Sequence, residues 1–322
     1  MISFIIIGRN VEKTIKICLR SVNNFIDVNK IEETEIIYVD SDSTDESINL
    51  ARKFEAKVVQ LQGNVNAAVG RNEGARTAGG EILFFIDGDM EILPDCYPYL
   101  FKSECRLVYP FLTGSFANRY YTENFHSVIN TDYPNTVGNP GDFKERNITG
   151  GLFIVEKGYW LRIGGMDSRL CANEDIDFAL RMANKGTKQR YYPNLLIAIH
   201  HTISYYENNR LFQFIFTPRL LCTGILIRKQ FFNSTFIPLL LRSRYSMFLL
   251  IVSLLALGFH FALGGFLLAS YLIIQTIRTY AVYKTESNFI NILLYKITYD
   301  IYSIVGVLFY YPATKRYRIL ES

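Results

Sequence analysis

The sequence predicts an α/β fold, in which a mostly parallel β-sheet with helices on both faces is followed by an α-helical, membrane-associated C-terminal region. Over residues 1–110, short β-rich runs alternate with segments of helical periodicity, which is typical of strand–helix–strand units. From residue 247 to residue 274 no Asp, Glu, Lys or Arg occurs, and this stretch is longer than a typical core helix. The 322 residues leave room for both regions.

The first part of the chain predicts alternating strands and helices. We expect strands over residues 3–7, 35–39, 57–61 and 81–86, and helices over residues 11–23, from about residue 45, and over residues 66–78. In sheets of this kind, ligands bind beyond the carboxyl ends of the strands, where Asp40 and Asp87 fall.

The next part of the chain has a different composition. Residues 110–150 are rich in Asn, Gly, Pro and Tyr, so we expect long loops there, as a lid or an acceptor surface. A helix over residues 176–184 and a strand over residues 191–201 follow. Because strand and helix signals continue to about residue 201, we expect one catalytic domain over residues 1–205.

The C-terminal region is predicted to contact a membrane. Residues 206–245 mix aromatic, leucine and basic side chains, which favours interfacial amphipathic helices over ordinary packed ones. Within residues 246–322 we expect transmembrane helices at about 247–274 and 289–311, although Lys296 and Asp300 interrupt the second. Two crossings place the basic tail and the N-terminal domain on one side, which the positive-inside rule makes the cytoplasmic face of the cell (inner) membrane.

Composition excludes other classes of partner and site. The formal net charge is only +4, and the basic residues cluster beside apolar segments, so no nucleic-acid partner is expected. The five cysteines are scattered and form no Cys-x-x-Cys pair, which predicts a reduced compartment without disulfides or a zinc site. The N-terminal MISFIIIGRN has no basic start and is predicted to be a strand, not a signal peptide.

Two aspartates follow the apolar run in FFIDGDME. Asp87 and Asp89 are separated by Gly88 alone. Asp and Gly are common in turns, so the tripeptide is compatible with a simple turn. The second interpretation is a divalent cation, because two carboxylates at this spacing can bind one hard ion, which removes their repulsion.

Four motifs occur in a fixed order along residues 1–205. They are VDSDSTDES (39–47), VGRNEGAR (69–76), IDGD (86–89), and GGMD followed by NEDIDFALR (173–181). Together they resemble the family-2 glycosyltransferases, which are inverting enzymes with the GT-A nucleotide-sugar-binding fold. The IDGD segment then corresponds to the family's DxD signature.

The resemblance implies roles for residues near the donor. Asp40 would accept a hydrogen bond from the nucleotide base, and Arg71 would approach the base or the diphosphate. Asp87 would contact the ribose or the metal, and Asp89 would ligate Mg²⁺ or Mn²⁺. Asp42 lies in the same loop as Asp40, where helix capping is the alternative role.

The first loop departs from the family pattern. Many relatives have Pro-x-Tyr-Asn-Glu there, whereas this chain has Ile7-Gly8-Arg9-Asn10-Val11, and the acidic residue is displaced to Glu12. Gly8 and Arg9 are our candidates for nucleotide-sugar contacts in this loop.

The resemblance also implies a general base and a histidine ligand. Inverting transfer needs one base for the acceptor hydroxyl, and the family's acidic pair corresponds to Glu174 and Asp175. We choose Asp175, with Glu174 as the alternative; first-turn acids that stabilise the helix dipole are the structural alternative. Since neighbours in a strand face opposite sides, only one of His200 and His201 can reach the metal, and we choose His200.

The predicted function is transfer of one sugar from a nucleotide-sugar, expected to be a UDP-sugar, to a lipid-linked or glycan acceptor for a cell-surface polysaccharide or glycolipid. The Gln-x-x-Arg-Trp motif of processive synthases is missing, which favours addition of single sugars. Alternatives are a polyprenyl-phosphate glycosyltransferase and a non-catalytic membrane scaffold. A Rossmann oxidoreductase is disfavoured, because the first turn lacks Gly-x-Gly-x-x-Gly.

Overall fold

The computed structural model describes residues 1–102, 105–122, 125–203, 215–283 and 289–321. The chain divides into two compact units. The sheet unit comprises Met1–Arg169, Glu174–Ile203 and Thr314–Ser322, and the helical unit comprises Leu170–Asn173 and Ser204–Ala313. The chain thus leaves the sheet unit near the expected boundary at residue 205 and returns to it at its C-terminal end.

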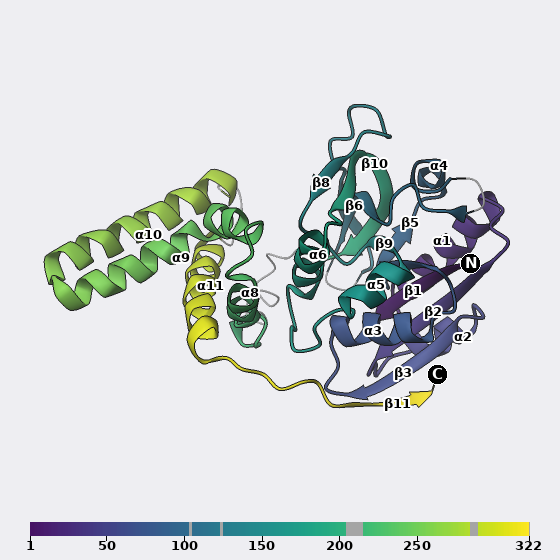
Figure 1. Ribbon diagram of the computed structural model, residues 1–322, viewed down its shortest axis with the longest axis horizontal. Helices are drawn as coiled ribbons and strands as arrows, with labels where there is room; N and C mark the ends of the chain where they lie inside the picture. Colours follow the sequence, from purple (N-terminus) through teal and green to yellow (C-terminus); the bar gives the residue numbers. More distant parts are fainter. Residues whose placement is uncertain (103–104, 123–124, 204–214, 284–288, 322) are drawn as a thin grey trace. The chain divides into compact units, whose positions relative to one another are not determined.

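The sheet unit contains one sheet of eleven described strands in the order β11-β3-β2-β1-β4-β9-β6-β10-β5, with β7 on β6 and β8 on β10 (Figure 1). The strands are β1 (Ile2–Gly8), β2 (Thr34–Ser41), β3 (Lys57–Gly63), β4 (Ile82–Asp87), β5 (Met90–Ile92), β6 (Phe111–Tyr121), β7 (Val128–Asp132), β8 (Lys144–Arg146), β9 (Phe153–Glu156), β10 (Gln189–Thr202) and β11 (Tyr317–Glu321). The four strands predicted before residue 110 and the strand predicted at 191–201 are confirmed as β1 to β4 and β10.

Helices cover both faces of the sheet, as predicted. Those of the sheet unit are α1 (Ile15–Val28), α2 (Ser47–Arg52), α3 (Ala67–Thr77), α4 (Tyr97–Leu100), α5 (Lys157–Ile163) and α6 (Glu174–Asn184). Phe25 of α1 packs against Phe84 in one core, and Trp160 of α5 packs against Phe85 in the other. Phe84 and Phe85 are neighbours on β4, so their side chains point to opposite faces of the sheet.

The sheet is mixed rather than mostly parallel. Strands β3, β2, β1 and β4 are mutually parallel, but β9 runs antiparallel to β4 and to β6, whereas β6 runs parallel to β10. The expectation of long loops over residues 110–150 was wrong, since β6, β7 and β8 lie there. Gly114, Ser115 and Asn118 weaken the local strand signal of β6, whose partner β10 is remote in sequence.

The helical unit contains α8 (Cys222–Gln230), α9 (Phe236–Phe259), α10 (Phe261–Tyr283) and α11 (Phe289–Phe309). The last three are each long and apolar enough to cross a membrane. Of residues 206–245, which we expected to form interfacial helices, 206–214 lie outside the described residues. The rest contains α8 and the start of α9.

The uncharged stretch 247–274 is two helices, not the single helix we expected. His260 has extended dihedral angles (φ −151°, ψ 100°), so α9 ends before it and α10 begins after it. Gly264 allows the two helices to approach closely here, because a Cβ at this position would lie 2.3 Å from the backbone nitrogen of Leu257. The two helices therefore form a hairpin whose turn is at His260.

The C-terminal strand returns the chain to the sheet. β11 pairs antiparallel with β3, and the hydroxyl of Tyr317 donates a 2.6 Å hydrogen bond to Glu73 Oε1 on α3. Lys315 Nζ donates to Asn64 Oδ1 in the loop after β3. The residues on either side of the helical unit are thus both anchored in the sheet unit.

Candidate functional site

The carboxyl ends of β1, β2 and β4 meet at one edge of the sheet. The parallel register pairs Gly8 with Asp40 and Ile7 with Asp87, so predicted site residues at three strand ends come together. The loops after β1 and β2 are tied to each other, because the Asn10 backbone N–H donates to Ser43 Oγ and Thr44 N–H donates to Asn10 Oδ1. These loops form a fixed border of the site.

Asp40 lies beneath this border. Its carboxylate is completely buried and accepts hydrogen bonds from the Tyr38 hydroxyl (3.0 Å) and from the Ser43 backbone N–H (2.8 Å). Asp42, two residues later, is partly exposed and adopts a left-handed conformation (φ +67°). Asp40 therefore shapes the loop from below, while Asp42 lies at its surface.

Gly8 and Arg9 lie at the other side of the same border. A Cβ on Gly8 would be 2.7 Å from a methyl group of Val11 and 3.0 Å from the Tyr38 hydroxyl, so only glycine fits here without displacing neighbours. Arg9 is exposed. Glu12, the displaced acid of this loop, accepts a hydrogen bond from the Glu46 backbone N–H and so holds the loops together.

Asp87 ends β4 and is held by an arginine. Arg71 Nη2 donates to Asp87 Oδ1 at 2.8 Å. Burial raises the pKa of Asp87 above its ordinary value, although the Arg71 charge acts in the opposite direction. The other oxygen, Oδ2, faces Gly151, where a Cβ would be only 2.2 Å away. The backbone at Gly151 therefore approaches the carboxylate as closely as glycine permits.

Asp89 faces His200. Asp89 Oδ2 lies 3.3 Å from His200 Nε2, and the Asn118 carbonyl oxygen Oδ1 lies 2.9 Å from His200 Nδ1. Because Asn118 Oδ1 is an acceptor, Nδ1 carries the proton, and the lone pair of a neutral Nε2 points toward Asp89. Such an arrangement needs a proton or a cation between the two groups.

His201 points to the opposite side of β10. Its Nε2 lies 2.9 Å from Glu91 Oε2, and its Nδ1 lies 2.8 Å from the hydroxyl of Tyr121. The hydrogen bond to His201 lowers the pKa of Glu91. The structure therefore places His200, and not His201, beside the DxD aspartates.

Arg71 is buried between two of the predicted site carboxylates. Its Nη1 donates to Glu174 Oε1 at 3.0 Å, while Nη2 contacts Asp87, and the side chain is 3% exposed. Burial opposes the charged form, but Asp87, Glu174 and Asp175 together raise the pKa of Arg71. Arg71, which we expect to approach the base or the diphosphate, lies between Asp87 and Glu174 and orients both.

The two acids at the start of α6 differ in environment. Glu174 is paired with Arg71, whereas Asp175 Oδ1 accepts a 2.7 Å hydrogen bond from the Ile176 backbone N–H. Burial, and then the charge of Glu174, raises the pKa of Asp175 to about 7. Asp177 is buried and forms an ion pair with Arg181 at 2.8 Å. Arg181 also donates hydrogen bonds to the backbone carbonyl groups of Ile163 and Gly165, at and just after the end of α5. Asp175 is thus the acid suited to exchange a proton near neutral pH.

Asn118 and Gly151 were not identified from the sequence. Asn118 is directly opposite His200 in the parallel register of β6 and β10, and no local motif marks it. Gly151 precedes β9 in a Gly-Gly pair, and this pair was the only available signal.

The donor set fits a hard divalent cation. Asp89 Oδ1 is buried and has no hydrogen-bond partner among the described residues, so it can accept a metal ion without losing another contact. Two carboxylates and one imidazole match the ligands used by Mn²⁺ and, for the carboxylates, Mg²⁺. Among the described residues no group of three or more His, Cys, Asp or Glu side chains is placed to hold a metal ion. Further ligands would have to come from a phosphate-bearing ligand or from water.

Comparisons with known proteins agree on one class. The family description "Glycosyl transferase family 2" matches residues 3–146. An uncharacterized glycosyltransferase of Haemophilus influenzae is 28% identical over 163 residues, which are 50% of this chain and 55% of that relative. The N-acetylgalactosaminyltransferase 6 of Drosophila melanogaster is 27% identical over 194 residues, 52% of this chain and 29% of that relative. The match therefore spans about half, or less, of these curated relatives.

Two crystal structures share the fold. Residues 1–349 of S. aureus TarS in complex with UDP-GlcNAc superpose with a TM-score of 0.54 and 17% identity, covering 92% of this chain and 91% of that one. GalNAc-T7 with UDP, GalNAc and Mn²⁺ superposes with a TM-score of 0.53 and 15% identity, covering 71% of this chain and 47% of that one. The α/β sheet core is thus that of GT-A glycosyltransferases.

Proposed function

We propose that the chain transfers one sugar, with inversion, from a nucleotide-sugar to an acceptor at a membrane surface, on the premise that its residues 3–146 match the description "Glycosyl transferase family 2". One observation carries the proposal. Arg71 joins the DxD carboxylate Asp87 to Glu174, the neighbour of Asp175, so the donor side and the base side form one hydrogen-bonded site.

The donor is proposed to be a UDP-sugar. The two structural neighbours were crystallised with UDP-GlcNAc and with UDP, which supports this nucleotide. The loops after β1 and β2, with Gly8, Arg9, Asp40 and Asp42, lie at the sheet edge where a base would dock. Since Asp40 already accepts two hydrogen bonds, Asp42 is the carboxylate better exposed for direct contact with the base.

Asp89, Asp87 and His200 would hold a Mg²⁺ or Mn²⁺ ion. When bound, such an ion would neutralise the negative charge that develops on the departing nucleoside diphosphate. Asn118 keeps the His200 ring in the orientation that directs Nε2 at Asp89. Arg71 keeps one oxygen of Asp87 occupied and therefore leaves the other for the ligand.

Asp175 is proposed as the general base. It would accept the proton of the acceptor hydroxyl as that oxygen attacks the anomeric carbon, while the C–O bond to the diphosphate breaks. Glu174 serves less well, because its carboxylate is held by Arg71. A pKa of about 7 makes Asp175 a stronger base than an ordinary aspartate once it is ionised.

The helical unit is proposed to attach the enzyme to the cytoplasmic side of the cell membrane. Three of its helices are long and apolar enough to cross, and the chain on both sides of them belongs to the sheet unit. A chain that begins and ends on one side must cross an even number of times. Membrane lipids are therefore partners, and a lipid-linked or glycan acceptor for a surface glycan is the expected acceptor class.

Polyprenyl phosphate itself is an alternative acceptor, and a non-catalytic scaffold is an alternative class. Against the scaffold, Asp87, Asp89 and Asp175 are all present, and Asp175 has the shifted pKa that proton transfer needs.

A donor screen on detergent-extracted protein tests the proposal. UDP-, GDP- and dTDP-sugars are supplied with Mg²⁺, Mn²⁺ or EDTA, and the release of free nucleoside diphosphate is measured. We expect turnover of one donor, lost with EDTA and in Asp89→Asn. The matched control is Glu145→Gln, because Glu145 is a carboxylate on β8 that pairs with Lys188 and takes no part in the site. Turnover that survives both EDTA and Asp89→Asn would contradict the proposed metal site. Metal-dependent UDP binding, without donor turnover and without transfer to any acceptor, would support the non-catalytic scaffold.

A further inference from the structure

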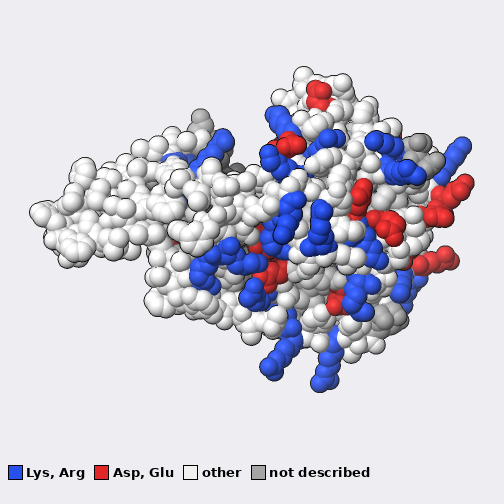
Figure 2. Space-filling model, in the orientation of Figure 1, with Lys and Arg blue, Asp and Glu red and all other residues white. Residues whose placement is uncertain are grey.

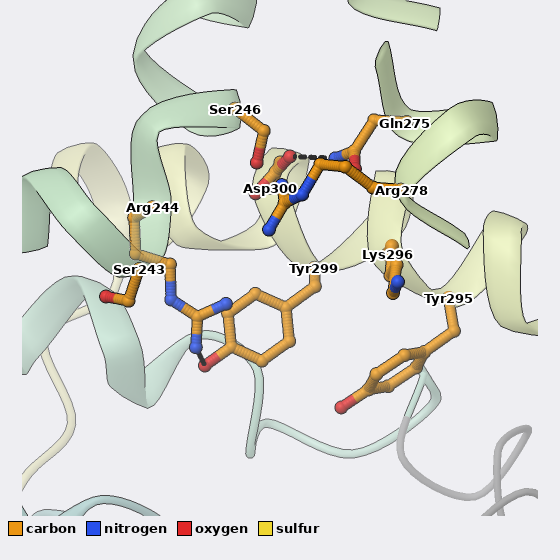
Figure 3. A pocket seen from close by; sticks show the side chains of 9 residues that line it. All are labelled: Ser243, Arg244, Ser246, Gln275, Arg278, Tyr295, Lys296, Tyr299 and Asp300. Carbon is orange, nitrogen blue, oxygen red and sulfur yellow. Dashed lines mark hydrogen bonds between the residues drawn. The ribbon is translucent and has the colours of Figure 1, made fainter. Parts of the chain in front are cut away.

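A polar cavity lies inside the helical unit. It has a volume of about 260 Å³ and is lined by residues of α9, α10 and α11 (Figure 3). Every lining residue is charged, an amide, a serine or a tyrosine. Helices apolar enough to cross a membrane rarely place so many polar groups together unless these groups contact a ligand or one another.

Cations outnumber anions in this cavity. Arg244 of α9, Arg278 of α10 and Lys296 of α11 line it, and Asp300 is the single carboxylate among the lining residues that the structure describes. Each cation comes from a different helix. Arg244 and Arg278 against Asp300 already give the described lining a net positive charge, which only the packing of the helices produces.

Asp300 is satisfied by neutral donors. It is 3% exposed and accepts hydrogen bonds from Gln275 Nε2 at 2.6 Å and from the Tyr271 hydroxyl at 3.1 Å. Among the described residues, neither Arg244 nor Arg278 forms an ion pair with a carboxylate within 4.0 Å. The aspartate thus offsets the cationic charge only in part.

Aromatic rings hold the two arginines in place. The Arg244 guanidinium lies 3.9 Å from the centre of the Tyr299 ring and donates from Nη2 to the Tyr299 hydroxyl at 2.7 Å (Figure 3). The Arg278 guanidinium lies 4.4 Å from the centre of the Tyr245 ring. A guanidinium has five N–H donors, so donors remain for an anion that enters the cavity.

The position of the arginines along the hairpin points to the headgroup level of a bilayer. Between Arg244 and Arg278 the chain contains no charged residue, and Figure 2 shows an uncharged surface on the hairpin. Phe259 and Phe261, beside the turn at His260, are 91% and 83% exposed. Sixteen residues from Arg244 to His260 and eighteen from His260 to Arg278 correspond to roughly 24–27 Å of helix. The arms are therefore slightly shorter than a hydrocarbon core of about 30 Å.

We propose that this cavity binds the phosphate group of an anionic lipid, with Arg244, Arg278 and Lys296 as its cationic contacts. Arginine binds phosphate oxygens through paired, charge-assisted hydrogen bonds, and two arginines line this cavity. The uncharged hairpin in the acyl region delivers the cavity to the depth at which lipid phosphates lie. The inference rests on the membrane attachment under the proposed function, and both phospholipids and polyprenyl phosphates carry the required chemistry.

Lipid binding to the full-length protein in an uncharged detergent tests the proposal. Native mass spectrometry measures retention of phosphatidylglycerol, phosphatidylcholine and polyprenyl monophosphate, and inorganic phosphate is offered as a competitor. We expect one phosphatidylglycerol or polyprenyl phosphate bound per chain, with affinity reduced about tenfold or more in Arg278→Gln and in Lys296→Gln. The matched control is Arg242→Gln, because Arg242 is exposed on α9 and does not line the cavity. Tighter retention of polyprenyl phosphate than of phosphatidylglycerol would show that the cavity prefers a lipid of the class that can accept a sugar.

Three results would overturn the proposal. They are an equal loss of affinity in Arg242→Gln, equal retention of phosphatidylcholine, and full displacement by inorganic phosphate at the concentration of the lipid. Asp89→Asn separates this proposal from the proposed function, since that variant should lose turnover and keep lipid binding. Arg278→Gln should keep donor hydrolysis in detergent, which also shows that the variant has folded.

Discussion

Arg71 Nη2 lies 2.8 Å from Asp87 Oδ1 in a partly buried ion pair at the sheet edge where β1, β2 and β4 end. The same guanidinium holds Glu174 at 3.0 Å through Nη1, so one side chain sets the positions of two motifs that lie 87 residues apart in sequence, from Asp87 to Glu174. This arrangement makes Arg71 a positioning residue whose loss affects stability and activity together.

We expect Arg71→Met to lower the free energy of unfolding by about 3–5 kcal/mol, because it leaves two largely buried carboxylates without their partner. Thermal unfolding of the extracted protein measures this change. The control is Lys188→Met, since Lys188 and Glu145 are each 47% exposed and form a surface pair, and such a pair contributes about 0–1 kcal/mol. Similar losses in both variants would contradict a special role for Arg71.

We expect the transfer rate to rise with pH through about 7, where Asp175 ionises in the folded protein. Asp175→Asn should lower the rate about 10²- to 10⁴-fold and abolish this limb of the pH profile. The measurement is the rate at saturating donor from pH 5 to pH 9, with Asp177→Asn tested only for folding. A wild-type profile without this limb would rule out Asp175 as the base.

The same shift predicts how stability depends on pH. The pKa of Asp175 is raised in the folded state, so the protonated side chain contributes stability below its unfolded pKa of about 3.9. This contribution falls as pH rises and is lost once the pH passes about 7. We therefore expect Asp175→Asn to be more stable than the wild type at pH 8 and similar to it at pH 4, as measured by thermal unfolding at both values.

Asn118→Ala should weaken Mn²⁺ binding about 10- to 100-fold, because Asn118 fixes the ring orientation of His200. Electron paramagnetic resonance counts free Mn²⁺ in a titration with UDP present, so the readout does not depend on turnover. Asn135→Ala is the control, since Asn135 is exposed in the same segment of the chain. An unchanged Mn²⁺ affinity in Asn118→Ala would show that His200 is held by other means or is no ligand.

Gly151→Ala should displace the Asp87 carboxylate and raise the KM for the donor about tenfold, since the added methyl would lie 2.2 Å from Asp87 Oδ2. Gly158→Ala provides the comparison, because nothing lies within 4 Å of a Cβ at that position of α5. Steady-state kinetics at saturating Mn²⁺ distinguish the two variants. Equal KM values would mean that the loop at Gly151 moves away when the donor binds.

The return of β11 to the sheet predicts that both ends of the helical unit face one side of the membrane. Single cysteines at Lys53 and at Arg318, in a background without the five native cysteines, should react with an impermeant maleimide in the same vesicle orientation. Labelling of the two sites from opposite sides would require an odd number of crossings and would contradict the pairing of β11 with β3. The control is a cysteine at Gly258, near the hairpin turn, which should differ from both.

Local patterns were sufficient for much of the sheet and for part of the site. The strands before residue 110 are continuous β-rich runs whose residues are buried on both faces, so their own sequence identifies them. Asp87 at the end of β4 and Asp89 just after it likewise lie at the edge where ligands of such sheets bind. Family resemblance then suggested the roles of Glu174 and Asp175.

Pairings between remote segments were not predictable in the same way. The strand β6 contains residues of low strand propensity and owes its conformation to β9 and β10. The division of the uncharged stretch at His260 depends on how α9 and α10 pack at Gly264. An uncharged run shows that a segment is apolar, but it does not show where the segment turns.

By itself, the sequence determined the parallel strands of the N-terminal half, the carboxylates at their ends and the apolar nature of the C-terminal region, because each depends on residues close together in the chain. Only the tertiary structure decided that Arg71 bridges Asp87 and Glu174, that Asn118 orients His200, and that β11 rejoins the sheet. These contacts form between residues that are distant in sequence. Their geometry is set by strand register and helix packing, which are properties of the whole fold.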